Sequence, residues 1–217
     1  ACGPRSLVTL PKLMKPLTSF LCKANKFLST EDIGEVEQGQ AKLMQLSILR
    51  SLIAVTETLP QFLAPYLNDL FDPHALPSAY LRRDTDDQAI SIKNISERLD
   101  EVLVSKVPAR VLIPSVSNTV ISNQHESTSL QALLSLLKSC TSSTKGSELA
   151  GHANTLLLVL THVYESCDSI GEDESLSSAC SELFLAPILK LSEVQLRSLY
   201  TRLRDWRGDF EKSDPNK

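Results

Sequence analysis

Apolar residues recur at three- and four-residue intervals along most of this chain. The clearest stripe lies between positions 149 and 164 and consists of Leu149, Ala153, Leu156, Leu157, Leu160, Val163 and Tyr164. Ile92, Ile95, Leu99, Val102 and Leu103 form a second one. Such spacing is typical of helices buried along one face. Further helices are predicted at roughly 6–28, 40–58, 60–71, 107–121, 127–142, 175–189 and 192–207, about nine in all.

Prolines mark three similar segments at intervals close to one helix pair. Leu10-Pro-Lys-Leu-Met-Lys-Pro16 and Leu59-Pro-Gln-Phe-Leu-Ala-Pro65 lie 49 residues apart, and Val107-Pro-Ala-Arg-Val-Leu-Ile-Pro114 follows 48 residues later with one extra residue. Because proline is tolerated in the first turn of a helix, Pro11, Pro60 and Pro108 are expected at equivalent turns of successive repeats. The alternative is a chance alignment of leucine-rich helices. The spacing favours an all-α fold, a HEAT-like solenoid of stacked antiparallel helix pairs.

Three polar stretches divide this pattern: Ser29 to Gly39, Asp72 to Gln88 and Glu165 to Ser175. We interpret residues 1–77 as N-terminal helical repeats, 78–88 as an acidic loop, 89–210 as C-terminal helical repeats and 211–217 as a flexible tail. The sequence does not begin with Met, and we expect it to be a section of a longer protein.

Composition narrows the possible classes of protein. The chain has 217 residues, 22 basic and 26 acidic side chains, a net charge of −4 and 42% hydrophobic residues. This balance argues against a compact module held on nucleic acid by a basic face and against a disordered chain. Five cysteines without a CxxC pair argue against a secreted disulfide framework. The longest strongly apolar run has 12 residues, too few for a membrane span.

The sequence contains none of the common motifs for a nucleophile, a phosphate loop or a metal site. A zinc site built from His162, Cys167 and Cys180 would need a fourth ligand, so the cysteines are expected to be buried thiols on helix faces. We therefore predict no catalytic, metal-binding or cofactor-binding residues. The chain is not expected to be an enzyme, to use a cofactor or to bind a small-molecule substrate.

The last predicted helix carries the best candidates for contact with a partner or with RNA. At 100° per residue, Leu199 shares an apolar arc with Tyr200 and Trp206, whereas Arg197 and Arg204 lie together on the other side. Such an arginine face is either a solvated surface or a site for a phosphate backbone or an acidic partner. Trp206 is expected to be a largely buried anchor.

Several of these segments resemble one known family. The segment from Phe184 to Trp206, with Lys190-Leu-Ser-Glu193 and Asp205-Trp206 as its most specific parts, is similar to a stretch of the large HEAT-repeat, small nucleolar RNA-associated subunit of the small-subunit processome. The segments 107–114, 130–137 and 148–164 resemble further elements in the family's order, and 59–67 resembles a preceding repeat. The chain looks like a divergent member of the C-terminal region.

The resemblance implies a non-catalytic scaffold in ribosome biogenesis that supports pre-rRNA transcription and small-subunit rRNA processing. It places the protein in the nucleus and nucleolus, with other subunits of a pre-ribosomal complex as partners, with indirect contact to pre-rRNA or small nucleolar RNA, and away from membranes. Lys190, Glu193 and Arg197 match the family's motif, and we expect structural roles for them. Ser192 is expected to cap the last helix, and Arg110 is expected to link neighbouring repeats.

Two alternative functions stay open at this point. One is a sequence-nonspecific RNA-binding surface in the same particle. The other is a cytoplasmic helical-repeat protein adaptor without a ribosomal role.

Overall fold

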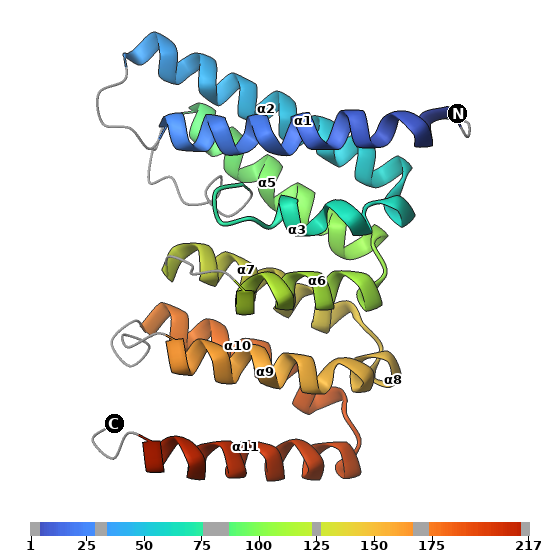
Figure 1. The fold of residues 1–217 in the computed structure, drawn as a ribbon, viewed down its shortest axis with the longest axis vertical. Helices are drawn as coiled ribbons and strands as arrows, with labels where there is room; N and C mark the ends of the chain where they lie inside the picture. The colour runs from blue at the N-terminus through green and yellow to red at the C-terminus, as the bar shows by residue number, and fades with distance from the viewer. Residues whose placement is uncertain (1–4, 29–33, 76–86, 123–126, 167–173, 214–217) are drawn as a thin grey trace.

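The computed structural model describes residues 5–28, 34–75, 87–122, 127–166 and 174–213, and within these ranges all regular secondary structure is helical. The helices stack in two layers along one axis (Figure 1). The longer ones are α1 (Arg5–Leu28), α2 (Glu35–Thr58), α5 (Asp87–Lys106), α6 (Ala109–Ser122), α7 (Ser127–Ser143), α9 (Ala153–Ser166), α10 (Glu174–Lys190) and α11 (Glu193–Ser213). Short helical turns complete the stack: η1 (Pro60–Phe62), η2 (Ala64–Tyr66), α3 (Leu67–Leu70), α8 (Gly146–Leu149) and η3 (Ala150–His152).

Each layer is a row of neighbouring helices. In the first layer α3 contacts α6, α6 contacts α9, and α9 contacts α11. In the second layer α2 contacts α5, α5 contacts α7, and α7 contacts α10. Helices of the two layers run in opposite directions (Figure 1). The expected solenoid of stacked antiparallel helix pairs is therefore confirmed.

One continuous apolar core runs between the two layers. It extends from Leu10 and Met14 in α1 to Cys180 and Leu183 in α10. A smaller second cluster joins α11 to the stack through Leu157, Leu191 and Leu199, with its fourth member Ala153. The amphipathic stripes described above supply most of both clusters, because a helix in such a stack buries one face against its layer and another against the opposite layer.

Two of the three expected prolines occupy equivalent places. Pro60 follows α2 and opens η1, and Pro108 follows α5 and immediately precedes α6. Pro11 lies instead inside α1, which begins six residues earlier at Arg5, so its expected place at a turn is wrong. The predicted helix over 60–71 is also broken, since Pro65 lacks the N–H that would continue it and two 3₁₀ turns result.

The polar stretches predicted as loops are helical at their ends. Helix α2 begins at Glu35, where Glu35 and Glu37 favour a helix N-terminus through the dipole, so Gly39 lies within the helix. Asp87 begins α5 in the same way, so only residues 78–86 of the predicted acidic loop lie outside the described residues. Residues 211–213 of the predicted tail belong instead to α11, which continues to Ser213, and 214–217 lie outside the described residues.

Candidate partner-binding surface

Helix α11 lies at the end of the stack and has one neighbour in its own layer, α9 (Figure 1). Ser192 precedes it, and the Gln195 side chain reaches back to Ser192, which is one half of a capping box. Gln195 Oε1 accepts hydrogen bonds from the Ser192 backbone N–H and from Ser192 Oγ, both at 2.9 Å. This arrangement satisfies polar groups at the helix start, which fixes where α11 begins.

The buried face of α11 is narrow. Leu199 is buried against the second apolar cluster, and Leu196 and Leu203 are half-buried beside it. Large apolar side chains elsewhere on the helix face solvent, among them Val194. Most of the circumference of α11 is thus available for contact with another molecule.

Arg197 and Arg204 both lie on the exposed side of α11. Arg197 Nη2 is 2.7 Å from Glu193 Oε1, with side chains that are 80% and 78% exposed. Arg204 Nη2 lies 3.6 Å from Asp205 Oδ1. Ion pairs this exposed contribute at most about 1 kcal/mol to stability. Both guanidinium groups can therefore exchange their present carboxylates for a phosphate or an acidic side chain at little cost.

Tyr200 joins the two arginines on this surface. Its side chain is 67% exposed, so its expected place in the apolar arc is wrong. It lies three residues after Arg197 and four before Arg204, a spacing that puts all three side chains on one helix face. The helical wheel places Tyr200 in the apolar arc beside Leu199. Its position about 100° from Leu199 was the signal that could have placed it at the edge.

Trp206 is half-buried rather than largely buried. Its indole N–H donates a 2.6 Å hydrogen bond to Glu165 Oε1, and its ring lies 6.3 Å from the Tyr164 ring at an interplanar angle of 57°. The two rings help line a cavity of about 310 Å³ between α9, α10 and α11, which also includes Leu160 and Phe184. The space beside the ring explains the exposure, because α11 packs against a gap and not against a filled core.

Lys190, the first residue of the family-like motif, holds the α7–α10 junction together. Its ammonium group donates hydrogen bonds to the backbone carbonyls of Thr141 at 2.9 Å, Thr144 at 2.8 Å and Ser142. These carbonyls lie at the C-terminus of α7, where helical partners are missing and positive charge is favoured. A Cβ on Gly146 would lie 2.4 Å from the Lys190 carbonyl oxygen, so the backbone approaches this junction closely.

Arg110 does not form the inter-repeat link expected of it. It is exposed in the first turn of α6 and makes no hydrogen bond or ion pair within the described ranges of the chain. The preceding Pro108 begins this turn, and the arginine points away from the core that Leu112 and Ile113 enter.

No disulfide joins Cys22, Cys140 and Cys180, the cysteines within the described ranges. Burial raises the pKa of the Cys140 thiol to about 11, with a smaller opposing effect from its hydrogen bond with Thr144. No group of three potential metal ligands comes together in the part of the chain that the structure describes, and Cys167 of the considered zinc set lies outside it. Among the described residues, no helix has the length and hydropathy of a membrane span.

The chain is similar to two proteins that share one name. HEAT repeat-containing protein 1 of Danio rerio is 30% identical over 167 residues, which is 74% of this chain and 8% of the relative. HEAT repeat-containing protein 1 of Homo sapiens is 26% identical over 208 residues, 91% of this chain and 9% of the relative. The chain is homologous to these proteins at modest identity and spans less than a tenth of their length. No protein-family model and no solved structure matches it.

Proposed function

We propose that this chain is a section of a non-catalytic scaffold in ribosome biogenesis, acting in the nucleolus within a complex that supports pre-rRNA transcription and small-subunit rRNA processing. The observation that carries the proposal is the homology to HEAT repeat-containing protein 1, which extends over 91% of this chain in the human relative. The ribosomal role itself rests on the resemblance of the Lys190–Trp206 segment to the processome family.

The geometry supports a scaffold in two ways. Two residues of the family-like motif form contacts at the joints of the stack. Lys190 ties α10 to α7, and Ser192 is hydrogen-bonded to Gln195 at the start of α11. The exposed sides of the helices then form a long surface on which other subunits can bind side by side, as stacked repeats generally provide. Protein subunits of a nucleolar pre-ribosomal complex are the partners that this function requires.

A direct RNA-binding role is the second candidate, and one observation favours it. Arg197, Tyr200 and Arg204 form an exposed cation–aromatic face on α11. Arginine contacts phosphates and an exposed tyrosine stacks on unpaired bases. The net charge of −4 opposes general attraction to RNA, so we give the protein-binding role precedence.

The test begins with the whole protein in its own cells. We expect the tagged protein to concentrate in nucleoli and to purify with pre-ribosomal proteins, and its depletion to cause uncleaved small-subunit precursor RNA to accumulate. An exclusively cytoplasmic protein whose loss leaves precursor RNA unchanged would be the adaptor and would overturn the proposal.

A binding titration separates the two candidate surfaces. The chain is mixed with a pre-rRNA segment at near-physiological salt, comparing the wild type with Arg197→Glu/Arg204→Glu. The matched control is Arg50→Glu/Arg98→Glu, two exposed arginines of α2 and α5. The scaffold proposal expects weak RNA binding that both variants change alike. Submicromolar binding lost only in the α11 variant would show direct RNA recognition.

A further inference from the structure

Helix α1 differs in charge from the rest of the molecule. It carries five basic residues, Arg5, Lys12, Lys15, Lys23 and Lys26, and no acidic residue, in a chain whose net charge is −4. The four lysines are exposed. The same helix exposes three large apolar side chains, Leu13 at 44%, Phe20 at 48% and Phe27 at 43%. A basic helix with an uncovered apolar stripe therefore forms one end of the stack (Figure 1).

The three apolar residues recur every seven positions, so they line up along α1. At 1.5 Å per residue the stripe from Leu13 to Phe27 is about 21 Å long, the length of a helix of about 15 residues. Lys12 and Lys23 lie about 60–80° to one side of Phe20 around the helix axis, and Ala24 lies about 40° to the other side, toward α2. The stripe thus has a basic border and a border that faces α2.

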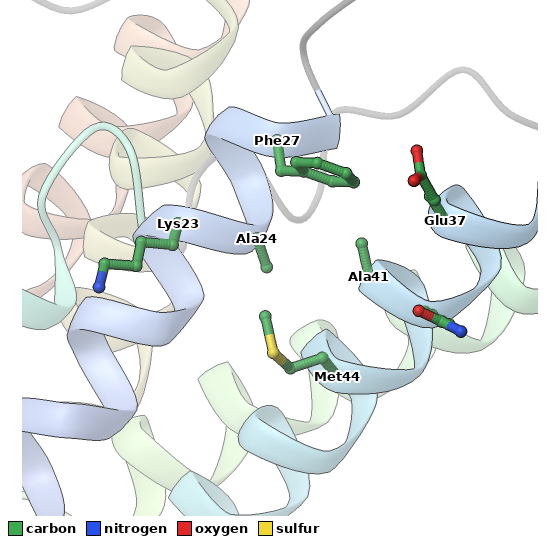
Figure 2. A pocket seen from close by; sticks show the side chains of 7 residues that line it. Lys23, Ala24, Phe27, Glu37, Ala41 and Met44 are labelled. Atoms are coloured by element: carbon green, nitrogen blue, oxygen red, sulfur yellow. The ribbon is translucent and has the colours of Figure 1, made fainter. Parts of the chain in front are cut away.

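A groove of about 400 Å³ continues the stripe between α1 and α2. Figure 2 shows Phe27 and Ala24 of α1 and Met44 and Ala41 of α2 turned toward the space between the helices, with Glu37 at its far side. Beyond Met44, α2 exposes Val36 and Leu43. The floor of the groove is apolar, its α1 border is basic, and its α2 border carries Gln40 and Glu37.

We infer that this α1–α2 groove is a docking site for an acidic amphipathic helix of a protein partner. The partner's apolar stripe would lie on Leu13, Phe20, Phe27 and Met44, and its carboxylates would face the α1 lysines. Complementary charge and a helix-length apolar stripe are the features by which a groove recognises an amphipathic helix. The stripe and the groove floor are apolar over about 21 Å, and a partner buries them only if it has a continuous apolar face of its own, so an amphipathic protein helix is favoured over RNA. This inference goes beyond the proposed function and does not depend on it.

The probe is a fluorescein-labelled peptide of about 18 residues built from Leu, Ala and Glu, with leucines at i, i+3, i+4 and i+7. We expect it to bind the chain, and expect two control peptides to fail: one with Lys in place of Glu, and one with the leucines redistributed around the helix. Fluorescence anisotropy gives the dissociation constants. Equal binding of all three peptides would overturn the inference.

Substitutions in the groove test whether the peptide binds there. Phe27→Ser should weaken binding about tenfold, as loss of a central aromatic contact does. Lys12→Glu/Lys23→Glu should weaken it several-fold, with an effect that shrinks as salt rises. The matched controls are Leu189→Ser, an apolar residue that is 75% exposed on α10, and Lys93→Glu/Lys106→Glu, two exposed lysines of α5. If a control weakens binding as much as its groove counterpart, the peptide binds elsewhere and the inference fails.

Other occupants of the α1–α2 groove would give different experimental results. Binding of a labelled oligouridine tighter than the acidic peptide, and lost in Lys12→Glu/Lys23→Glu, would make the groove an RNA site. Self-association in sedimentation that Phe27→Ser abolishes would make it an interface between copies. A photo-crosslinker at position 43 in the whole protein that joins only to the same polypeptide would assign the groove to another segment of that polypeptide. Each result overturns the inference.

Discussion

Replacing Lys190 with methionine tests whether the family-like motif stabilises the stack. Lys190→Met keeps the length of the apolar stem and removes the ammonium group. The α7 carbonyls of Thr141, Ser142 and Thr144 then lose their common donor. The side chain of Lys190 is half-buried, and Thr141 and Thr144 are buried. Water can therefore hydrate the freed carbonyl of the exposed Ser142 more easily than the carbonyls of the buried Thr141 and Thr144.

The size of the effect follows from these contacts. A hydrogen bond to a charged group contributes about 1.5–3 kcal/mol net, and a cation at a helix C-terminus contributes about 0.3–1 kcal/mol. The contributions of one ammonium group are not additive, and water replaces part of the loss at Ser142. We expect the free energy of unfolding to fall by about 2 kcal/mol.

Lys138→Met is the matched control, because it makes the same chemical change between the same two helices. Lys138 Nζ lies 2.6 Å from Glu182 Oε2, but the two side chains are 44% and 51% exposed. Such a pair should cost less than about 1 kcal/mol.

Urea unfolding followed by far-UV circular dichroism measures the loss in both variants. Fluorescence of Trp206, the chain's single tryptophan, reports separately on the α11 end. If Lys190→Met costs no more than Lys138→Met, the carbonyl contacts contribute nothing beyond an ordinary surface charge, and the reasoning is refuted.

Three further predictions concern packing and ionisation. In urea titrations, Gly146→Ala should lower the free energy of unfolding by about 1–3 kcal/mol, since the new Cβ would meet the Lys190 carbonyl. The control Gly151→Ala places its Cβ where no atom lies within 4 Å, so it should change that free energy by less than about 1 kcal/mol. Trp206→Ala should cost about 2 kcal/mol by circular dichroism, less than the about 3–5 kcal/mol of a fully buried aromatic residue. Because burial raises the pKa of Cys140 from 9.0 to about 11, this thiol should stay protonated and resist iodoacetamide at pH 10 in the folded chain, and should react once urea unfolds the chain. The same pKa shift predicts that the free energy of unfolding falls as pH rises from 9 to 11, because the unfolded chain releases the thiol proton first.

The helices could be predicted from the sequence because their apolar stripes are long and regular. The stripe from Leu149 to Tyr164 predicts α9, and the polar stretches lie close to the observed helix ends. Proline was a weaker guide, since Pro11 lies inside a helix that other contacts stabilise. Tyr200 and Trp206 were misplaced because periodicity gives the direction of a side chain and not the presence of a neighbour to cover it.

The two binding surfaces differ in how far the sequence could reveal them. Arg197 and Arg204 were visible as a pair on a helical wheel. The groove between α1 and α2 could not be predicted in this way, because its apolar residues follow the same sequence pattern as core residues. Only the structure shows that no described part of the chain covers them. Lys190 was recognisable only through its motif, since its three carbonyl partners lie 46 to 49 residues away.

Hydrogen bonds between successive helix pairs, within one layer, join residues at nearly constant separation along the chain. Asn25 reaches the carbonyl of His74, 49 residues on, Gln131 reaches Ser175 after 44, and Arg202 reaches Asn154 after 48. Each helix pair is thus matched to the pair that follows it. Duplication of one such unit in the gene would recreate the same set of neighbours at the new boundary, and loss of one unit would leave the remaining contacts in register. A stack held together in this way can lengthen or shorten by whole units during evolution while its core stays continuous.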